Sequence, residues 1–152
     1  AFRDAVARHG GAINQFQGDG LQAVFGFPHA TEHDGRRAVE AALAVHAAVR
    51  LLRIRYAQQG APDLSVHSGI HSGVVLAREG DNVAGRVEIF GPGPGIAKHL
   101  SDVAEADEIL VSEETLGPGS HLFETAQRRF VTLKGRAEPL AIHRILGRMP
   151  LR

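Results

Sequence analysis

The chain has 152 residues, of which 43% are hydrophobic, and this is enough for one domain with one substantial core. Lysine plus arginine equals aspartate plus glutamate at 17 each, so no net charge directs the domain toward nucleic acid or an anionic membrane. The absence of cysteine excludes disulfides and thiolate metal sites. No apolar run approaches the roughly 20 residues of a membrane span. We therefore expect a cytoplasmic domain that contacts neither nucleic acid nor membrane.

The first ten residues have the pattern of a short amphipathic helix. Phe2, Ala5 and Val6 recur at helical spacing, and Gly10 with Gly11 supplies a C-terminal stop. Because the chain begins with alanine in what reads as mid-helix, we expect residues 1–152 to form a single domain within a larger protein.

The most informative stretch is INQFQGDGLQAVFGF, residues 13–27. Two half-apolar segments, 12–17 and 21–27, flank Gly18-Asp19-Gly20, and this pattern predicts a tight β-hairpin because glycine accepts positive φ without steric cost. The hairpin places the Asp19 carboxylate at its tip. Taken alone, the hairpin favours the interpretation of Asp19 as a surface residue chosen for its turn chemistry.

The remaining elements follow from periodicity. An alanine-rich stripe containing Val39, Leu43 and Val49 predicts a long helix over 31–59. A strand pair is expected at 64–78 and 86–90, with its turn at 79–82. Helix, strand, strand, helix, strand, strand is the order of a βαββαβ-like core without its first strand, and it implies an antiparallel sheet with helices on one face.

Five short motifs follow one another along the chain, the first at the hairpin tip and the other four after the long helix. They are GDG (18–20), GIHSG (69–73), IFG (89–91), ILVS (109–112) and LKG (133–135). This order and spacing resemble the class III nucleotide cyclase domain, the adenylyl and guanylyl cyclase family, over nearly the whole chain. The resemblance implies an α+β, ferredoxin-like βαββαβ fold whose first strand would precede Ala1.

The resemblance also implies a reaction and its requirements. Such domains convert ATP or GTP to a cyclic nucleotide and pyrophosphate, with two Mg²⁺ or Mn²⁺ ions, at a site built by two domains in a homodimer or by pairing with another cyclase domain. Asp19 matches the second of two metal-binding aspartates; the first would lie upstream of Ala1. Lys134 matches the lysine that holds the terminal phosphates, although locally it also reads as an exposed lysine at a strand end.

Four further positions match the family's site but depart from its residues. Gly95 and His99 stand where the resemblance implies an asparagine that orients the ribose and an arginine that stabilises the transferring phosphoryl group. Histidine is shorter than arginine and cannot form its bidentate fork. Gln15 and Glu88 stand where adenylyl cyclases use lysine and aspartate to read adenine, and this pair can still hydrogen-bond the edge of a base.

A rival interpretation applies to the glycine-rich run at 90–97. As a dinucleotide-binding loop it would cradle phosphate on backbone N–H groups, with Glu113 as a ribose-binding acid. Pro92 and Pro94 remove two of those donors, and Ile96 replaces the last glycine. Pro94 instead predicts the first turn of a helix.

The nine histidines invite a metal site, and their spacing argues against one. On an extended strand His67 and His71 would be about 13 Å apart, too far to share an ion. His29 and His33 flank a helix start and read as solvated or capping residues.

Two classes of function remain. Asp19 and Lys134 favour an enzyme, a cyclase completed by upstream residues and by dimerisation. Gly95, His99 and Gln15 favour a degenerate cyclase-homology domain that acts as a dimerising regulatory module. We expect the cyclase fold with weak or lost activity.

Overall fold

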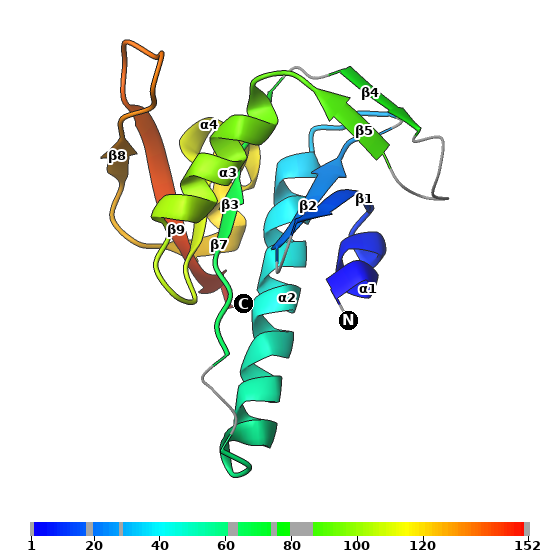
Figure 1. Ribbon diagram of the computed structural model, residues 1–152. Helices are drawn as coiled ribbons and strands as arrows, with labels where there is room; N and C mark the ends of the chain where they lie inside the picture. Colours follow the sequence, from blue (N-terminus) through cyan, green and yellow to red (C-terminus); the bar gives the residue numbers. More distant parts are fainter. Residues whose placement is uncertain are drawn as a thin grey trace.

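The computed structural model describes residues 2–17, 20–27, 29–60, 64–73, 76–79 and 87–150 (Figure 1). Its helices are α1 (Phe2–Arg8), α2 (Asp34–Ala57), α3 (Gly93–Val103) and α4 (Glu113–Leu116), followed by a 3₁₀ helix, η1 (Gly117–Leu122). Its strands are β1 (Gly11–Gln17), β2 (Gly20–Phe25), β3 (Ser68–Ile70), β4 (Leu76–Glu79), β5 (Val87–Phe90), β6 (Ile109–Ser112), β7 (Phe123–Thr125), β8 (Arg129–Val131) and β9 (Leu140–Arg148). Within the described residues, no helix is both long and apolar enough to cross a bilayer.

A mainly antiparallel sheet forms the centre of the molecule. Its strand order is β3-β6-β9-β7, and β8 also pairs with β9. Strands β3 and β6 run parallel, with Gly69 opposite Leu110, whereas β9 pairs antiparallel with β6, β7 and β8. The α+β class and the predominance of antiparallel pairing are thus confirmed.

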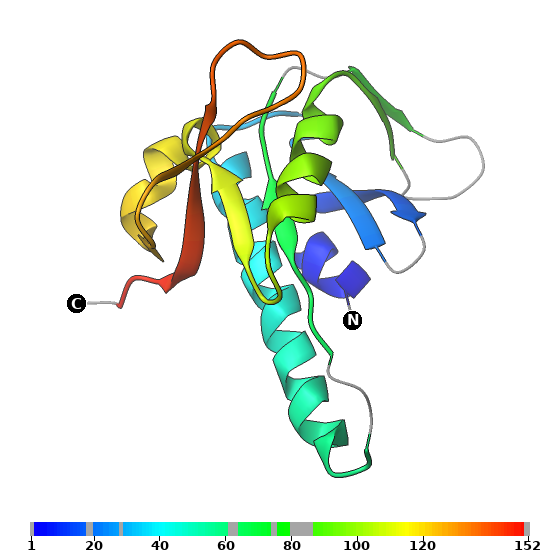
Figure 2. The same ribbon diagram turned by 60° about the vertical axis from the view of Figure 1, so that its left-hand side comes forward.

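Both faces of this sheet are covered by helices. Along β6, Val111 packs into a cluster with Val39 of α2, whereas the adjacent Leu110 packs into a second cluster with Leu100 of α3. Since neighbouring strand residues point to opposite faces, α2 and α3 lie on opposite sides of the sheet. Figure 2 shows the strands between these two helices. Helices α1 and α2, the two helices of the expected βαββαβ core, lie against each other, and α3, whose crossover leads from β3 to β6, covers the face that α2 leaves open.

Two short hairpins complete the fold. β1 pairs with β2 and β4 pairs with β5, both antiparallel. The predicted β1–β2 hairpin is confirmed, with its second strand ending at Phe25. The predicted long strand at 64–78 is instead divided between β3 and β4. The chain leaves β3 after Ile70, and the Ser72 backbone N–H donates to Thr115 Oγ1 (2.7 Å) instead of continuing the strand, so β3 pairs with β6 and only β4 pairs with β5.

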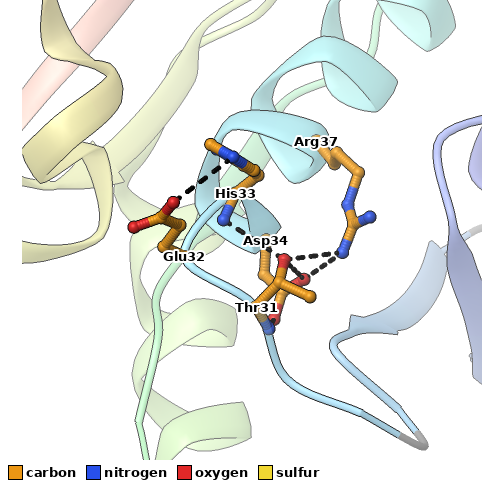
Figure 3. A network of polar contacts seen from close by, with 5 residues as sticks. All are labelled: Thr31, Glu32, His33, Asp34 and Arg37. Atoms are coloured by element: carbon orange, nitrogen blue, oxygen red, sulfur yellow. Dashed lines mark hydrogen bonds and ion pairs between the residues drawn. The ribbon is translucent and has the colours of Figure 1, made fainter.

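The start of α2 lies three residues later than predicted because residues 31–33 form a capping loop (Figure 3). Asp34 accepts hydrogen bonds from the Thr31 N–H (2.8 Å) and the Thr31 hydroxyl (3.0 Å), and Arg37 donates to both side chains. The Asp34 carboxylate also occupies the space beside Gly26, where a Cβ would lie 2.5 Å from Oδ2. Gly26, at φ 106°, therefore lets the end of β2 approach the start of α2 closely.

Candidate functional site

The hairpin β1–β2 carries the first group of candidate residues. Gln15 of β1 lies directly opposite Gln22 of β2, and its Nε2 donates to Gln22 Oε1 at 3.2 Å. The pairing shifts by one residue between Ile13 and Gln15, which is a β-bulge at Asn14. Bulges re-aim neighbouring side chains and are common beside active sites. The hairpin tip with Asp19 lies outside the described residues.

Strand β5 brings a second candidate position next to the hairpin. β1 and β5 lie against each other, and Glu88 of β5 is in register with Arg78 of β4. The structure thus places the strands of Gln15 and Glu88 side by side, as a shared base-binding role requires. The Glu88 side chain lies outside the described part of the chain.

Helix α3 carries Gly95 and His99, and its opposite side is held tightly against β3. At Gly69 a Cβ would lie only 2.3 Å from Ala97 O and from Ser101 N, so α3 packs directly on the β3 backbone. Gly95 is exposed, and a Cβ there would meet no atom within 4 Å. His99 is half-buried. Pro94 lies in the first turn of α3, as predicted, so the run at 90–97 starts a helix.

Lys134 lies in the turn between β8 and β9 and is exposed. The preceding Leu133 is buried in one cluster with Leu100 of α3 and with Ala104, which follows the helix. Gly135 follows at φ 82°, a conformation that glycine adopts readily. The turn that carries Lys134 therefore packs, through Leu133, against the helix that carries Gly95 and His99.

The described candidates thus fall into two groups, one on β1 and β5 and one on α3 and the turn after β8. Gly95, His99 and Lys134 depend on the core under α3, whereas Gln15 and Glu88 depend on the two hairpins. A nucleotide has the same division, with its base at one end and its phosphates at the other.

A metal centre is not evident in the part of the chain that the structure describes, where no group of three or more histidine, cysteine, aspartate or glutamate side chains gathers. The remaining candidate ligand is Asp19, outside that part.

Three histidines near β3 are instead bonded to serine hydroxyls. His46 of α2 contacts Ser68 (2.8 Å), His67 contacts Ser101 of α3 (3.2 Å), and His71 contacts Ser112 of β6 (2.8 Å). They tie β3 to its neighbours on three sides. Nothing in the sequence pattern marks these pairs, because the partners are 22 to 41 residues apart.

Burial keeps two of these histidines neutral. It lowers the pKa of His46 to about 4, against a small opposing effect of Asp107, and it also lowers the pKa of His71. The Ser112 hydroxyl, which contacts His71, is also hydrogen-bonded to the Thr115 hydroxyl (2.6 Å). The Thr115 hydroxyl is in turn hydrogen-bonded to the Ser72 hydroxyl. These groups are structural supports beneath α3 and α4.

Sequence reasoning missed Gln22. The expected strands 12–17 and 21–27 would place residue 15 opposite residue 23, whereas the structure pairs Gln15 with Gln22.

Comparison with known proteins gives a consistent result. The family model described as "Adenylate and Guanylate cyclase catalytic domain" matches residues 1–146. In Rhizobium meliloti (strain 1021), an uncharacterised protein is 30% identical over 149 residues, and adenylate cyclase 1 is 25% identical over 149 residues. These matches cover 97% and 96% of this chain, but the chain spans only 14% and 22% of the length of those relatives.

Solved structures agree with the family match. The guanylyl cyclase Cya2 superposes with a TM-score of 0.86 at 25% identity, over 97% of this chain and 76% of that one. The adenylyl cyclase CyaB from P. aeruginosa superposes with a TM-score of 0.81, also at 25% identity, over 95% of this chain and 76% of that one. The likeness to a guanylyl and to an adenylyl cyclase is therefore equal in identity.

Proposed function

The chain belongs to the family of adenylate and guanylate cyclase catalytic domains, and we propose that it binds a purine nucleoside triphosphate but converts it slowly or not at all. In the reaction, the 3′-oxygen of the nucleotide bonds to its own α-phosphorus and loses its proton. The bond from that phosphorus to the oxygen bridging the β-phosphate breaks, and pyrophosphate leaves.

The observation that carries this proposal is the state of α3. At Gly95 there is open space and no side chain to orient a ribose, and at His99 there is an imidazole in place of the implied guanidinium. Arginine spreads charge over phosphate oxygens through paired donors, which an imidazole cannot do. Loss of such an arginine contact costs on the order of 10³-fold or more in phosphoryl transfer. Low turnover with retained binding follows.

Binding is expected to use residues that remain suitable. Lys134 is an exposed ammonium next to Gly135, and it suits the terminal phosphates. Asp19 is proposed to ligate Mg²⁺ or Mn²⁺, which would offset the charge of the triphosphate when bound. Replacing Asp19 with alanine should weaken binding of Mn²⁺-ATP in calorimetric titration. Equal affinity of the variant and the wild type would leave Asp19 as a turn residue.

Assembly is the second part of the proposal. We propose that two such domains, identical or not, form the site together, and that the domain works in the cytoplasm without contacting nucleic acid or membrane. The balanced charge of the chain supports the absence of contact with nucleic acid and with anionic membranes. A catalytically degenerate, dimerising regulatory module is the alternative, favoured by the missing side chain at Gly95.

The test restores the two departures together. Gly95→Asn with His99→Arg should raise cyclase turnover by at least about 100-fold, far more than it changes nucleotide affinity, because the restored contacts act mainly in the transition state. Gly95→Ala with His99→Gln is the matched control, since it changes both helix positions without supplying the amide or the guanidinium. Cyclic nucleotide formation is measured with Mn²⁺-ATP and Mn²⁺-GTP.

If the double variant binds nucleotide and dimerises but stays at background turnover, these positions do not limit the chemistry. The regulatory module is then the better description.

A further inference from the structure

The solvent-facing side of α3 carries a lysine to which the family resemblance assigns no role. On this side of the helix Gly95, Lys98 and Asp102 are exposed. The other side is buried in the core through Leu100. Residues three and four positions apart are neighbours on a helix surface, so Gly95, Lys98 and Asp102 form one exposed row. Lys98 lies at the centre of this row.

The gap at Gly95 leaves room for the Lys98 side chain. Long side chains of an α-helix point toward its N-terminus and cover the residues three and four positions earlier. For Lys98 this direction leads over Gly95, where a Cβ would meet no atom within 4 Å. Three residues rise about 4.5 Å along a helix, which the four-carbon stem of lysine spans. The Lys98 ammonium can therefore reach the space that a side chain at position 95 would fill.

Lys98 is paired with Asp102, and this ion pair is weak. Lys98 Nζ lies 3.3 Å from Asp102 Oδ2, and the two side chains are 63% and 61% exposed, so water and salt screen their attraction. The order of the charges is also the less favourable one, because an acid that precedes a base suits the helix dipole better than the reverse. A triphosphate carries several negative charges and outcompetes a single exposed carboxylate for the ammonium.

We propose that Lys98 is a phosphate-binding residue: when a nucleoside triphosphate binds, its ammonium leaves Asp102, passes over Gly95 and donates to phosphate oxygens. This inference rests on the proposed function, in which α3 faces the nucleotide. The contact supplies a cation beside His99, where the implied guanidinium is missing. Because it acts on the bound nucleotide and on the transition state alike, it strengthens binding without raising turnover.

Removal of the Lys98 charge tests the contact. Lys98→Gln should weaken binding of Mn²⁺-ATP and Mn²⁺-GTP by about fivefold to tenfold, the scale of a hydrogen bond to a charged group. The loss should be equal for the two nucleotides, because they share the triphosphate. Lys98→Arg keeps the positive charge and should lose less than about twofold. Dissociation constants are measured by calorimetry, and thermal unfolding checks that each variant folds.

Arg55→Gln is the matched control for the change in net charge. Arg55 is exposed and lies in the last turn of α2, at the end of that helix that points away from α3 (Figures 1 and 2). At physiological salt, exposed charges separated by more than about 8 Å are largely screened from each other. Arg55→Gln should therefore leave the affinity for both nucleotides unchanged.

Asp102→Asn tests the exchange of partners. Without its carboxylate partner the Lys98 ammonium is free, so the affinity for both nucleotides should rise by about twofold, the scale of an exposed ion pair on a helix. In a Lys98→Gln background the same substitution should have no effect, because the ammonium that it releases is gone.

Unchanged affinity of Lys98→Gln, an equal loss in Lys98→Arg or Arg55→Gln, or an unequal loss for the two nucleotides would overturn the inference while leaving the proposed nucleotide binding in place. An effect of Asp102→Asn that persists without Lys98 would also overturn it, since Asp102 would then act on the nucleotide by itself. Failure of the wild type to bind either nucleotide would remove the proposed function and this inference together.

Discussion

The two sides of α3 differ in how much freedom the structure leaves to the sequence. Toward β3 the helix lies against the backbone at Gly69, with no room for one more carbon atom. Away from β3 it presents Gly95, where a Cβ would meet nothing within 4 Å. Gly69 thus permits close packing of α3 on β3, whereas Gly95 leaves an open position on the other side of the helix.

This difference separates fold from activity. The side of α3 that packs on β3 supports the fold, so a substitution there lowers the stability of the domain. The open side contributes nothing to the core, so residues can be lost or restored there with little structural cost. A domain can therefore keep the cyclase fold while its catalytic positions change.

The largest effect on stability is expected for Gly69→Ala, on the packed side of α3. The added carbon would overlap Ala97 O and Ser101 N, both backbone atoms that cannot rotate away, so α3 must shift from the sheet. We expect a loss of about 3 kcal/mol in the free energy of unfolding, measured by urea denaturation. Gly73→Ala is the control, since its nearest neighbour would be 4.0 Å away. Equal stability of the two variants would contradict the close packing.

A change of pH tests the other side of β3, where His46 of α2 holds Ser68. Burial lowers the pKa of His46 from 6.5 to about 4, so between these values the unfolded chain binds a proton that the folded chain refuses. The stability from neutral His46 is complete above pH 6.5 and is lost as the pH falls toward 4. From pH 7 to pH 5 the wild type should lose about 2 kcal/mol more than His46→Gln. Parallel stability profiles of the two proteins over that range would refute this account.

The smallest expected effect is on stability and concerns Gly95, on the open side of α3. Gly95→Ala should stabilise the protein by about 0.5 to 1 kcal/mol, because alanine is the better helix former and the new methyl group clashes with nothing. The melting temperature should rise by a few degrees while nucleotide affinity stays unchanged. Destabilisation would show that Gly95 has a structural role that the open space does not reveal.

The local elements were predictable from the sequence because their signals are local. Pro94 predicted the start of α3, and Gly18-Asp19-Gly20 predicted the hairpin of β1 and β2. The pairing of Gln15 with Gln22 and the bulge at Asn14 have no signature in the residues themselves.

The arrangement of the sheet could not be predicted in the same way. The strand expected at 64–78 is divided because Ser72 bonds Thr115, 43 residues away, and such a contact leaves no periodicity in the sequence. The side of the sheet that α3 covers depends on the parallel pairing of β3 with β6, which is equally remote. Local pattern reasoning therefore identified the elements and the class of fold, but not which strands pair across these distances.

The parallel pairing of Gly69 with Leu110 also has a kinetic consequence. Closing the loop between Gly69 and Leu110 costs more chain entropy than closing the hairpin, where Gln15 meets Gln22 only seven residues later. Contacts between residues distant in the chain slow folding. We therefore expect the hairpin with Gln15 to form early and α3, with Gly95 and His99, to dock late, so that the two groups of proposed site residues reach their final positions at different times.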